Sequence, residues 1–323
     1  MIVLNKSLAR QWSRIGPRGI YGQALYSCAS ENNNIFAISA DLGNSSGLDR
    51  FKKTFPDRFL NIGIAEQNMI GFSSGLSTCS FNVFASSFAP FITMRSGEQV
   101  RMNLSYMRSN VKLVAIGSGI SMGFLGNSHF GLEDISIIRS MPNILIINPC
   151  DCFEVYKSVE ALSKYNGPAY LRLTGAAQNP IVHKEDYEFN IGKISILKEG
   201  KEILFLVYGS TCSPALEAAN FLSETENLDI KVVNVHTLRP IDEELIKTIR
   251  EFDSLCIFEE HSEIGGLKSI VSELLISNDI RPKNFKCMNL PSKFLSSGTY
   301  EELMKKYCLT KENFIDLAIS LKN

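Results

Sequence analysis

The sequence has no excess of charge of either sign and no long hydrophobic run. Its 33 lysines and arginines nearly balance 34 acidic residues, which gives a formal net charge of −1. Such a balance provides no electrostatic reason to bind nucleic acid or acidic lipid. No apolar run reaches the roughly 18 residues of a membrane span, and the apolar stretch at the amino-terminal end is too short for a signal peptide. We therefore expect a cytoplasmic protein that contacts neither nucleic acid nor membrane.

Motifs for metal and nucleotide binding are also missing. The eight cysteines form no C-x-x-C pair and have no histidine beside them, so we expect reduced thiols and no metal site. There is no Walker loop, no G-x-G-x-x-G after a strand and no H-E-x-x-H. These absences remove support for P-loop nucleotide hydrolysis, dinucleotide binding and zinc-dependent proteolysis.

What the sequence does contain is a regular alternation of apolar runs and amphipathic stretches. A length of 323 residues suggests about two domains. In the first half, the alternation predicts a mostly parallel sheet flanked by helices. The expected strands are 35–39, 81–86, 111–117, 144–148 and 169–173, and the expected helices lie near 19–31, 66–79, 88–105 and 151–164.

A polar stretch near residues 175–200 interrupts this alternation. We interpret 181–195 as a linker between a first domain, 1–180, and a second domain, 196–323. Because the linker is polar, we expect His183 to face solvent. The alternation then resumes, so that the second domain is also predicted to be α/β. Its expected strands are 203–209, 230–235 and 254–260, and its expected helices are 213–224, 241–251 and 265–277.

Two residues stand out as candidates for a functional site. Glu66 lies within the apolar segment FPDRFLNIGIAEQNMIGFSSGL, where a buried carboxylate is costly unless a partner compensates it. His129 lies in the glycine-rich stretch GSGISMGFLGNSHFGLEDIS, which follows a predicted strand. Loops at the carboxyl ends of parallel strands commonly bind ligands, so His129 is predicted to belong to a site.

Other polar or aromatic residues allow two interpretations each. Arg172 ends a predicted buried strand and is either half of a structural ion pair or an anion receptor. Asp41 follows the first strand and either caps a turn or contacts a ligand. Phe88 and Phe91 have helical i,i+3 spacing, which is more typical of a core than of a ligand platform.

Taken in order, several segments resemble the transketolase family. SADLGNSSG, FPDRFLNIGIAEQNM, FASSFAPF, GNSHFGLEDI, MPNILIINPCD and GPAYLRL resemble its pyrimidine-binding domain. VNVHTLRPID and EEHSEIGGLKS resemble its C-terminal domain, so the resemblance extends from about residue 15 to 320. The family's pyrophosphate-binding domain carries a G-D-G, which this sequence lacks.

The chain therefore resembles the C-terminal subunit of a split transketolase. This resemblance implies a thiamine diphosphate cofactor and an N-terminal partner subunit with the pyrophosphate-binding domain. The partner would hold most of the diphosphate and its Mg²⁺. We expect self-association of this chain and a two-plus-two heterotetramer with the partner.

The resemblance also implies roles for individual residues. In the family, a buried glutamate hydrogen-bonds the cofactor's aminopyrimidine ring and thereby promotes loss of the thiazolium proton; Glu66 matches it. His129 matches a histidine that faces the oxygens of the sugar substrate. The remaining matches are Phe88 and Phe91 for the aromatic wall of the pyrimidine pocket, Asp41 and Leu42 for cofactor contacts, and Arg18, Ser45 and Arg172 for sugar-phosphate contacts.

One loop departs from the family pattern. Family members usually carry GEDG-x-[ST]-H, whereas this sequence reads GFLGNSH, with Phe124 and Leu125 in place of the acidic pair. The second acid of that pair contacts a hydroxyl of the ketose donor, and leucine offers no acceptor for it. A histidine often found at the start of the loop is here Gly117. We expect retained thiamine chemistry with an unusual donor or acceptor.

Two other interpretations remain open. The chain also fits the beta subunit of a 2-oxoacid dehydrogenase or half of a deoxyxylulose-phosphate synthase, since those enzymes also pair a glutamate with thiamine diphosphate. Release of carbon dioxide from a 2-oxoacid would distinguish them from a transketolase. A non-catalytic scaffolding homologue is favoured by Gly117 and Leu125 and opposed by Arg18 and Glu66.

Overall fold

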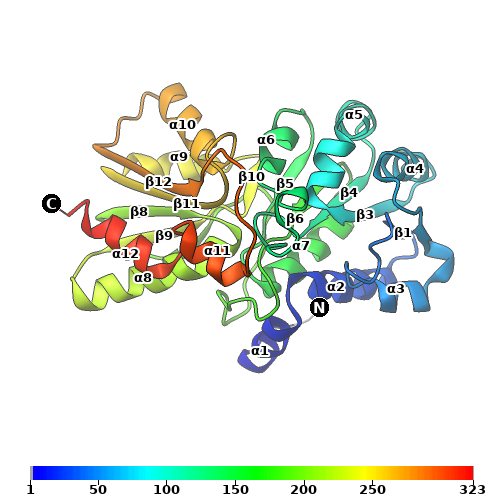
Figure 1. The fold of residues 1–323 in the computed structure, drawn as a ribbon, viewed down its shortest axis with the longest axis horizontal. Helices are drawn as coiled ribbons and strands as arrows, with labels where there is room; N and C mark the ends of the chain where they lie inside the picture. The colour runs from blue at the N-terminus through cyan, green and yellow to red at the C-terminus, as the bar shows by residue number, and fades with distance from the viewer. Residues whose placement is uncertain (1–2, 323) are drawn as a thin grey trace.

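The computed structural model describes residues 3–322 and contains two sheets side by side (Figure 1). The first sheet has seven strands, in the order β10-β5-β6-β4-β3-β1-β2. All neighbours in it are parallel except β10 and β5. The strands are β1 (Ile35–Ser39), β2 (Phe59–Asn61), β3 (Asn82–Phe88), β4 (Val111–Ile116), β5 (Leu145–Ile147), β6 (Ala169–Arg172) and β10 (Thr237–Arg239).

Helices cover both faces of this sheet, because successive side chains of its central strands point to opposite sides. In β4, Leu113 packs into one hydrophobic cluster and Val114 into the other, and every residue of the strand is buried. One face is covered by α1 (Lys6–Ile15), α2 (Pro17–Glu31), α3 (Asp49–Thr54) and α7 (Cys152–Lys164). The other is covered by α4 (Glu66–Thr78), η2 (Phe91–Arg95), α5 (Gly97–Gln99), η3 (Val100–Tyr106) and α6 (Asp134–Arg139).

The second sheet has five strands, in the order β12-β11-β8-β9-β7, and only β7 is antiparallel to its neighbour. Figure 1 shows α9 and α10 on one side of it and α8, α11 and α12 on the other. The strands are β7 (Ser195–Lys198), β8 (Ile203–Val207), β9 (Ile230–Asn234), β11 (Ser254–Ser262) and β12 (Asn284–Leu290). The helices are α8 (Cys212–Thr225), α9 (Glu243–Arg250), α10 (Leu267–Ser277), α11 (Tyr300–Lys306) and α12 (Lys311–Ile319).

The two sheets share one hydrophobic core. A single cluster of buried side chains contains Tyr170 of β6 together with Leu204 of β8 and Val233 of β9. In addition, β10 follows β9 in the chain but pairs with β5 of the first sheet. The second half of the chain therefore contributes a strand to the first sheet, and the halves are joined by more than the segment between them.

The predicted fold class, two α/β units with mostly parallel sheets, is confirmed. The single helix expected at 88–105 is wrong. β3 continues to Phe88, because Phe88 still pairs with Ile116 of β4, and the following residues form π-helical turns around the short helix α5. Phe88 and Phe91 are therefore not two positions on one regular helix. No helix within residues 3–322 combines the length and the apolar character needed to cross a membrane.

Candidate functional site

The candidate site lies at the carboxyl ends of three neighbouring parallel strands. β1, β3 and β4 are adjacent and run in the same direction, so the segments that follow them meet at one edge of the sheet. Phe88 ends β3, and the loop that carries His129 follows β4. Glu66 is the first residue of α4, which packs against β3.

Glu66 is almost fully buried, with 2% of its surface exposed. Its carboxylate accepts a hydrogen bond from Nη1 of Arg95 at 2.7 Å and another from Oγ of Ser87 at 3.3 Å. The position at the start of α4 also favours a negative charge, since backbone N–H groups point out of a helix N-terminus. The buried acid is thus compensated by one cation, one hydroxyl and a helix end.

The Arg95 guanidinium links this carboxylate to a group of three rings. The ring centroids of Phe88 and Phe91 are 5.8 Å apart, and each lies 5.2 Å from that of His129. The Arg95 guanidinium lies 4.2 Å from the centre of the Phe91 ring. Partial burial and the positive charge of Arg95 both lower the pKa of His129, which keeps the imidazole neutral at neutral pH.

The structure thus brings four of the predicted residues together, namely Glu66, Phe88, Phe91 and His129. The sequence interpretation missed two others. Arg95 and Ser87 lie within or beside the quoted FASSFAPF segment, but we gave neither a role. A buried carboxylate needs a compensating partner, and this need was the signal for a cation near Glu66. It did not identify which arginine that cation would be.

Asp41 and Leu42 follow β1 at the same edge of the sheet. Asp41 is exposed and exchanges two hydrogen bonds with Asn61, at 2.9 and 3.0 Å, so it links the ends of β1 and β2. Leu42 is half-buried against the core. Their roles as cofactor contacts stay predictions.

Arg18 and Ser45 are near each other on the surface. Arg18 is exposed in the first turn of α2, and Ser45 lies in the turn just before Gly47. Gly47 has a left-handed φ of 73°, and a side chain on it would lie 2.6 Å from the Arg18 carbonyl oxygen. The backbone of the 42–47 turn therefore packs directly on the start of α2. The roles of Arg18 and Ser45 as phosphate contacts stay predictions.

Arg172 is placed differently from the anion receptor that we expected. It is fully buried, and its Nε donates to Oδ2 of Asp134 at 2.8 Å. Its other two nitrogens donate to Oδ1 of Asn148 and to the carbonyl oxygens of Gly131 and Glu260. All three nitrogens are occupied by the protein, so the structure supports the alternative of a structural ion pair.

The expectation that His183 faces solvent is wrong. Only 10% of its side chain is exposed, because Asp151 accepts hydrogen bonds from the backbone N–H groups of Val182 and His183 and holds this segment against α7. Burial alone would lower the pKa of His183, but Cys150 and the Asp151 carboxylate raise it. Atoms of Cys150, Asp151 and His183 that could bind a metal lie within 4.8 Å of one another, yet both Asp151 oxygens already accept backbone N–H groups.

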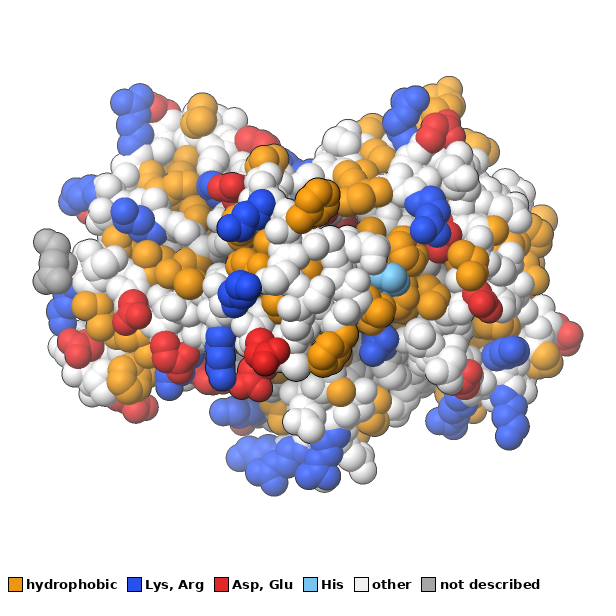
Figure 2. All heavy atoms as spheres, viewed as in Figure 1, with side chains coloured by type: hydrophobic (Ala, Val, Ile, Leu, Met, Phe, Trp, Pro, Cys, Tyr) orange, Lys and Arg blue, Asp and Glu red, His pale blue; other side chains and the backbone are white. Residues whose placement is uncertain are grey.

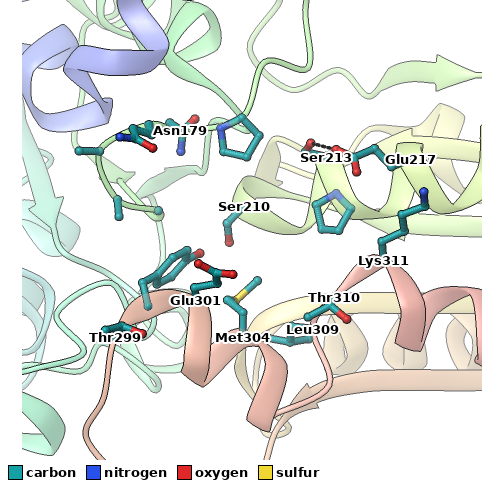
Figure 3. A pocket seen from close by; sticks show the side chains of 17 residues that line it. Asn179, Ser210, Ser213, Glu217, Thr299, Glu301, Met304, Leu309, Thr310 and Lys311 are labelled. Carbon is teal, nitrogen blue, oxygen red and sulfur yellow. Dashed lines mark hydrogen bonds between the residues drawn. The ribbon is translucent and has the colours of Figure 1, made fainter.

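A separate cavity of about 540 Å³ lies near the junction of the two halves (Figure 3). It is lined by residues of the 175–180 segment, the start of α8 and α11, and none of the site residues predicted from the sequence lines it. Figure 3 shows Ser213 hydrogen-bonded to Glu217 on its α8 side, at 3.0 Å. Because Glu66 does not line this cavity, a ligand bound in the cavity would not contact Glu66.

Comparison with known proteins agrees with the fold. Residues 14–178 match the family described as transketolase, pyrimidine binding domain, and residues 192–314 match transketolase, C-terminal domain. The chain is 37% identical to a putative transketolase C-terminal section of Methanocaldococcus jannaschii, covering 92% of this chain and 93% of that protein. It is 33% identical to one of the subunits of an apulose-4-phosphate transketolase of Phocaeicola vulgatus, covering 94% and 97%.

A similar structure has also been solved. It is described as a split gene transketolase, inactive beta4 tetramer, and superposes with a TM-score of 0.83 at 36% identity. The match covers 93% of this chain and 96% of that one, so the two chains share both domains and their arrangement.

Proposed function

This chain belongs to the transketolase family, and we propose that it is the C-terminal subunit of a split transketolase that depends on thiamine diphosphate. It would transfer a two-carbon ketol unit from a ketose or ketose phosphate to an aldose-type acceptor. The observation that carries this proposal is the buried Glu66 at the start of α4, beside the aromatic rings of Phe88 and Phe91.

The residues present suit the pyrimidine end of the cofactor. A flat heteroaromatic ring stacks on aromatic faces, and Phe91 is half-exposed at this edge of the sheet. A buried carboxylate is a strong acceptor for a ring nitrogen that carries or shares a proton. These are the two contacts that position and polarise such a ring. The diphosphate and Mg²⁺ would be held mainly by the partner subunit.

Thiamine diphosphate, when bound, supplies a carbon nucleophile and an electron sink. In the proposal, Glu66 holds a proton at the edge of the pyrimidine ring and fixes its protonation state. Phe88 and Phe91 orient the ring and exclude water from it. His129, whose lowered pKa keeps it neutral, donates or accepts a hydrogen bond at a substrate oxygen without adding charge.

The sugar-binding part of the site differs from that of common transketolases. Phe124 is 79% exposed and Leu125 is 49% exposed on the loop between β4 and α6. Neither offers an acceptor for a donor hydroxyl, so we propose a donor or acceptor with a different hydroxyl pattern from the usual pentose phosphates. Arg18 and Ser45 remain the proposed phosphate contacts.

The test is reconstitution of the full chain with a pyrophosphate-binding partner subunit, thiamine diphosphate and Mg²⁺, followed by a screen of ketose phosphates and 2-oxoacids. We expect ketol transfer, and we expect Glu66→Gln to reduce its rate by about a hundredfold or more, because the ring loses its proton-holding partner. Glu98→Gln, at an exposed acid on the same side of the sheet, should leave the rate unchanged.

Three results would contradict the proposal. Unchanged turnover in Glu66→Gln, with folding checked by circular dichroism, would remove Glu66 from catalysis. Carbon dioxide release from a 2-oxoacid would instead assign a dehydrogenase or deoxyxylulose-phosphate synthase type of reaction. No turnover of any substrate by a complex that assembles normally would support a scaffolding homologue.

A further inference from the structure

Arg95 makes the same two kinds of contact that the proposed pyrimidine ring requires. Its Nη1 donates a hydrogen bond to Oε2 of Glu66 at 2.7 Å. Its guanidinium lies over the face of the Phe91 ring, 4.2 Å from the centroid. One planar group thus satisfies the buried carboxylate and covers the aromatic face at once.

A guanidinium and a protonated aminopyrimidine have similar chemistry. Both are flat and delocalised, both donate N–H groups from one edge to a carboxylate, and both stack on an aromatic ring. The guanidinium and the pyrimidine ring would use the same acceptor, Glu66, and the same aromatic face, Phe91. The two groups therefore cannot bind there at the same time. Whichever group is bound excludes the other.

The arginine also explains how the chain tolerates Glu66 without a ligand. A carboxylate that is 2% exposed and left unpaired carries a large desolvation cost. Ser87 contributes one hydrogen bond of 3.3 Å, whereas Arg95 contributes the closer, charged one. Because 46% of the Arg95 side chain is exposed, it has room to swing outward into solvent without disturbing the core.

We infer that Arg95 occupies the pyrimidine place in the ligand-free chain and that cofactor binding exchanges its guanidinium for the ring. This inference rests on the proposed function for the identity of the ring. Arg95 is then a positioning residue: it keeps Glu66 compensated and the Phe91 face covered until the cofactor arrives. The exchange also lowers the affinity of the chain for cofactor, since the Arg95 contacts must be broken first.

The first measurement is the thermal unfolding of the full ligand-free chain in four forms: wild type, Arg95→Met, Glu66→Gln and the double variant. Arg95→Met should lower the unfolding temperature, because Glu66 then lacks its cation. The same substitution should have little effect in the Glu66→Gln background, where no buried charge remains. Equal effects of Arg95→Met in both backgrounds would overturn the pairing.

The second measurement separates an exchange from a purely structural pairing. Thiamine diphosphate with Mg²⁺ is titrated into the full chain assembled with the pyrophosphate-binding partner subunit, which supplies the diphosphate site, and affinity is taken from the concentration dependence of the unfolding temperature. Arg95→Met should tighten binding about tenfold, since the competing group is gone. Arg95→Lys should tighten it less, and Arg101→Met, at an exposed arginine of η3, should not change it.

Weaker binding, unchanged binding, or no binding by both wild type and Arg95→Met would each overturn the exchange. These outcomes are distinct from failure of the proposed function. If the reconstituted enzyme transfers ketol units but Arg95→Met does not tighten cofactor binding, only the exchange is wrong. If no transfer occurs although Arg95→Met tightens binding, the exchange stands as a ligand-binding property and the enzymatic proposal is wrong.

Discussion

His261 shows how strongly its surroundings control the ionisation of one side chain. It is fully buried in β11, with Nδ1 2.8 Å from the carbonyl oxygen of Ser262 and Nε2 3.7 Å from Oδ1 of Asp134. Burial lowers its pKa to about 4, with Asp134 opposing the shift and Arg172 adding to it. In the unfolded chain the usual value near 6.5 applies, so unfolding takes up a proton below that pH.

The folded state is therefore expected to lose stability as pH falls from about 6.5 to about 4, by roughly 3 kcal/mol from His261 alone. Urea unfolding of the full chain across this pH range measures the loss, and His261→Asn should reduce its slope. His183→Asn is the matched control. The raised pKa of His183 contributes stability that is complete below about 6.5 and is lost at higher pH, so its removal should leave the acid slope unchanged. An equal acid slope in wild type and His261→Asn would contradict the prediction.

At the scale of secondary-structure elements, the hydrogen bonds of Arg172 connect β6, α6 and β11. Arg172 ends β6, its partner Asp134 begins α6, and the Glu260 carbonyl that it also contacts belongs to β11 of the second sheet. The pairing is fully buried, so removing one partner leaves a charge without compensation. These contacts, together with the shared core, fix the two sheets relative to each other.

Arg172→Met is expected to reduce the free energy of unfolding by about 3–5 kcal/mol, because Asp134 would be left buried without a cation and with only the Tyr170 hydroxyl as a hydrogen-bond donor. Arg139→Met, which breaks the more exposed pair with Glu273, should cost only about 0–1 kcal/mol. Equilibrium urea unfolding compares the two. A double variant, Arg172→Met with Asp134→Asn, should recover part of the loss. If Arg172→Met costs no more than Arg139→Met, the structural assignment of Arg172 fails.

For the whole molecule, exposed apolar side chains concentrate beside the candidate site. On α4 and the segments around it, Ile64 is 77%, Tyr106 is 77% and Met107 is 56% exposed. Figure 2 shows hydrophobic side chains on the surface of both halves of the molecule, including the half that carries α4 and α5. Apolar groups gathered in this way commonly mark contacts between protein chains. We propose that this region, here called the α4 face, mediates self-association of the chain.

Tyr106→Asp is expected to shift the full chain toward monomer, since a charge on the α4 face opposes its burial between two copies. Sedimentation velocity at several concentrations measures the shift. The control is Ile276→Asp, because Ile276 is 83% exposed on α10, away from the α4 face. Self-association through the α4 face would be refuted if the wild-type chain sedimented as a monomer at all concentrations. It would also be refuted if Ile276→Asp had the same effect as Tyr106→Asp.

The sequence by itself determined the α/β class, most central strands and the prominence of Glu66. These are local or periodic properties: continuous apolar runs indicate strands buried on both faces, and one acid in an apolar segment is visible without a fold. The sequence also placed His129 in a loop that follows a strand, and the carboxyl ends of parallel strands are where ligand-binding loops gather. Short edge elements such as β2 and β10 have too few residues to produce a pattern.

Only the tertiary structure decided which partners the charged residues meet. Arg95 reaches Glu66 from 29 positions away, and Arg172 finds Asp134 from 38 positions away. No spacing rule predicts such pairs, because they depend on which helix packs over which strand. The same arginine type is therefore a buried structural cation at 172 and a half-exposed neighbour of the site at 95. The difference between these two arginines comes from packing between residues far apart in the chain, which the periodicity of the sequence does not specify.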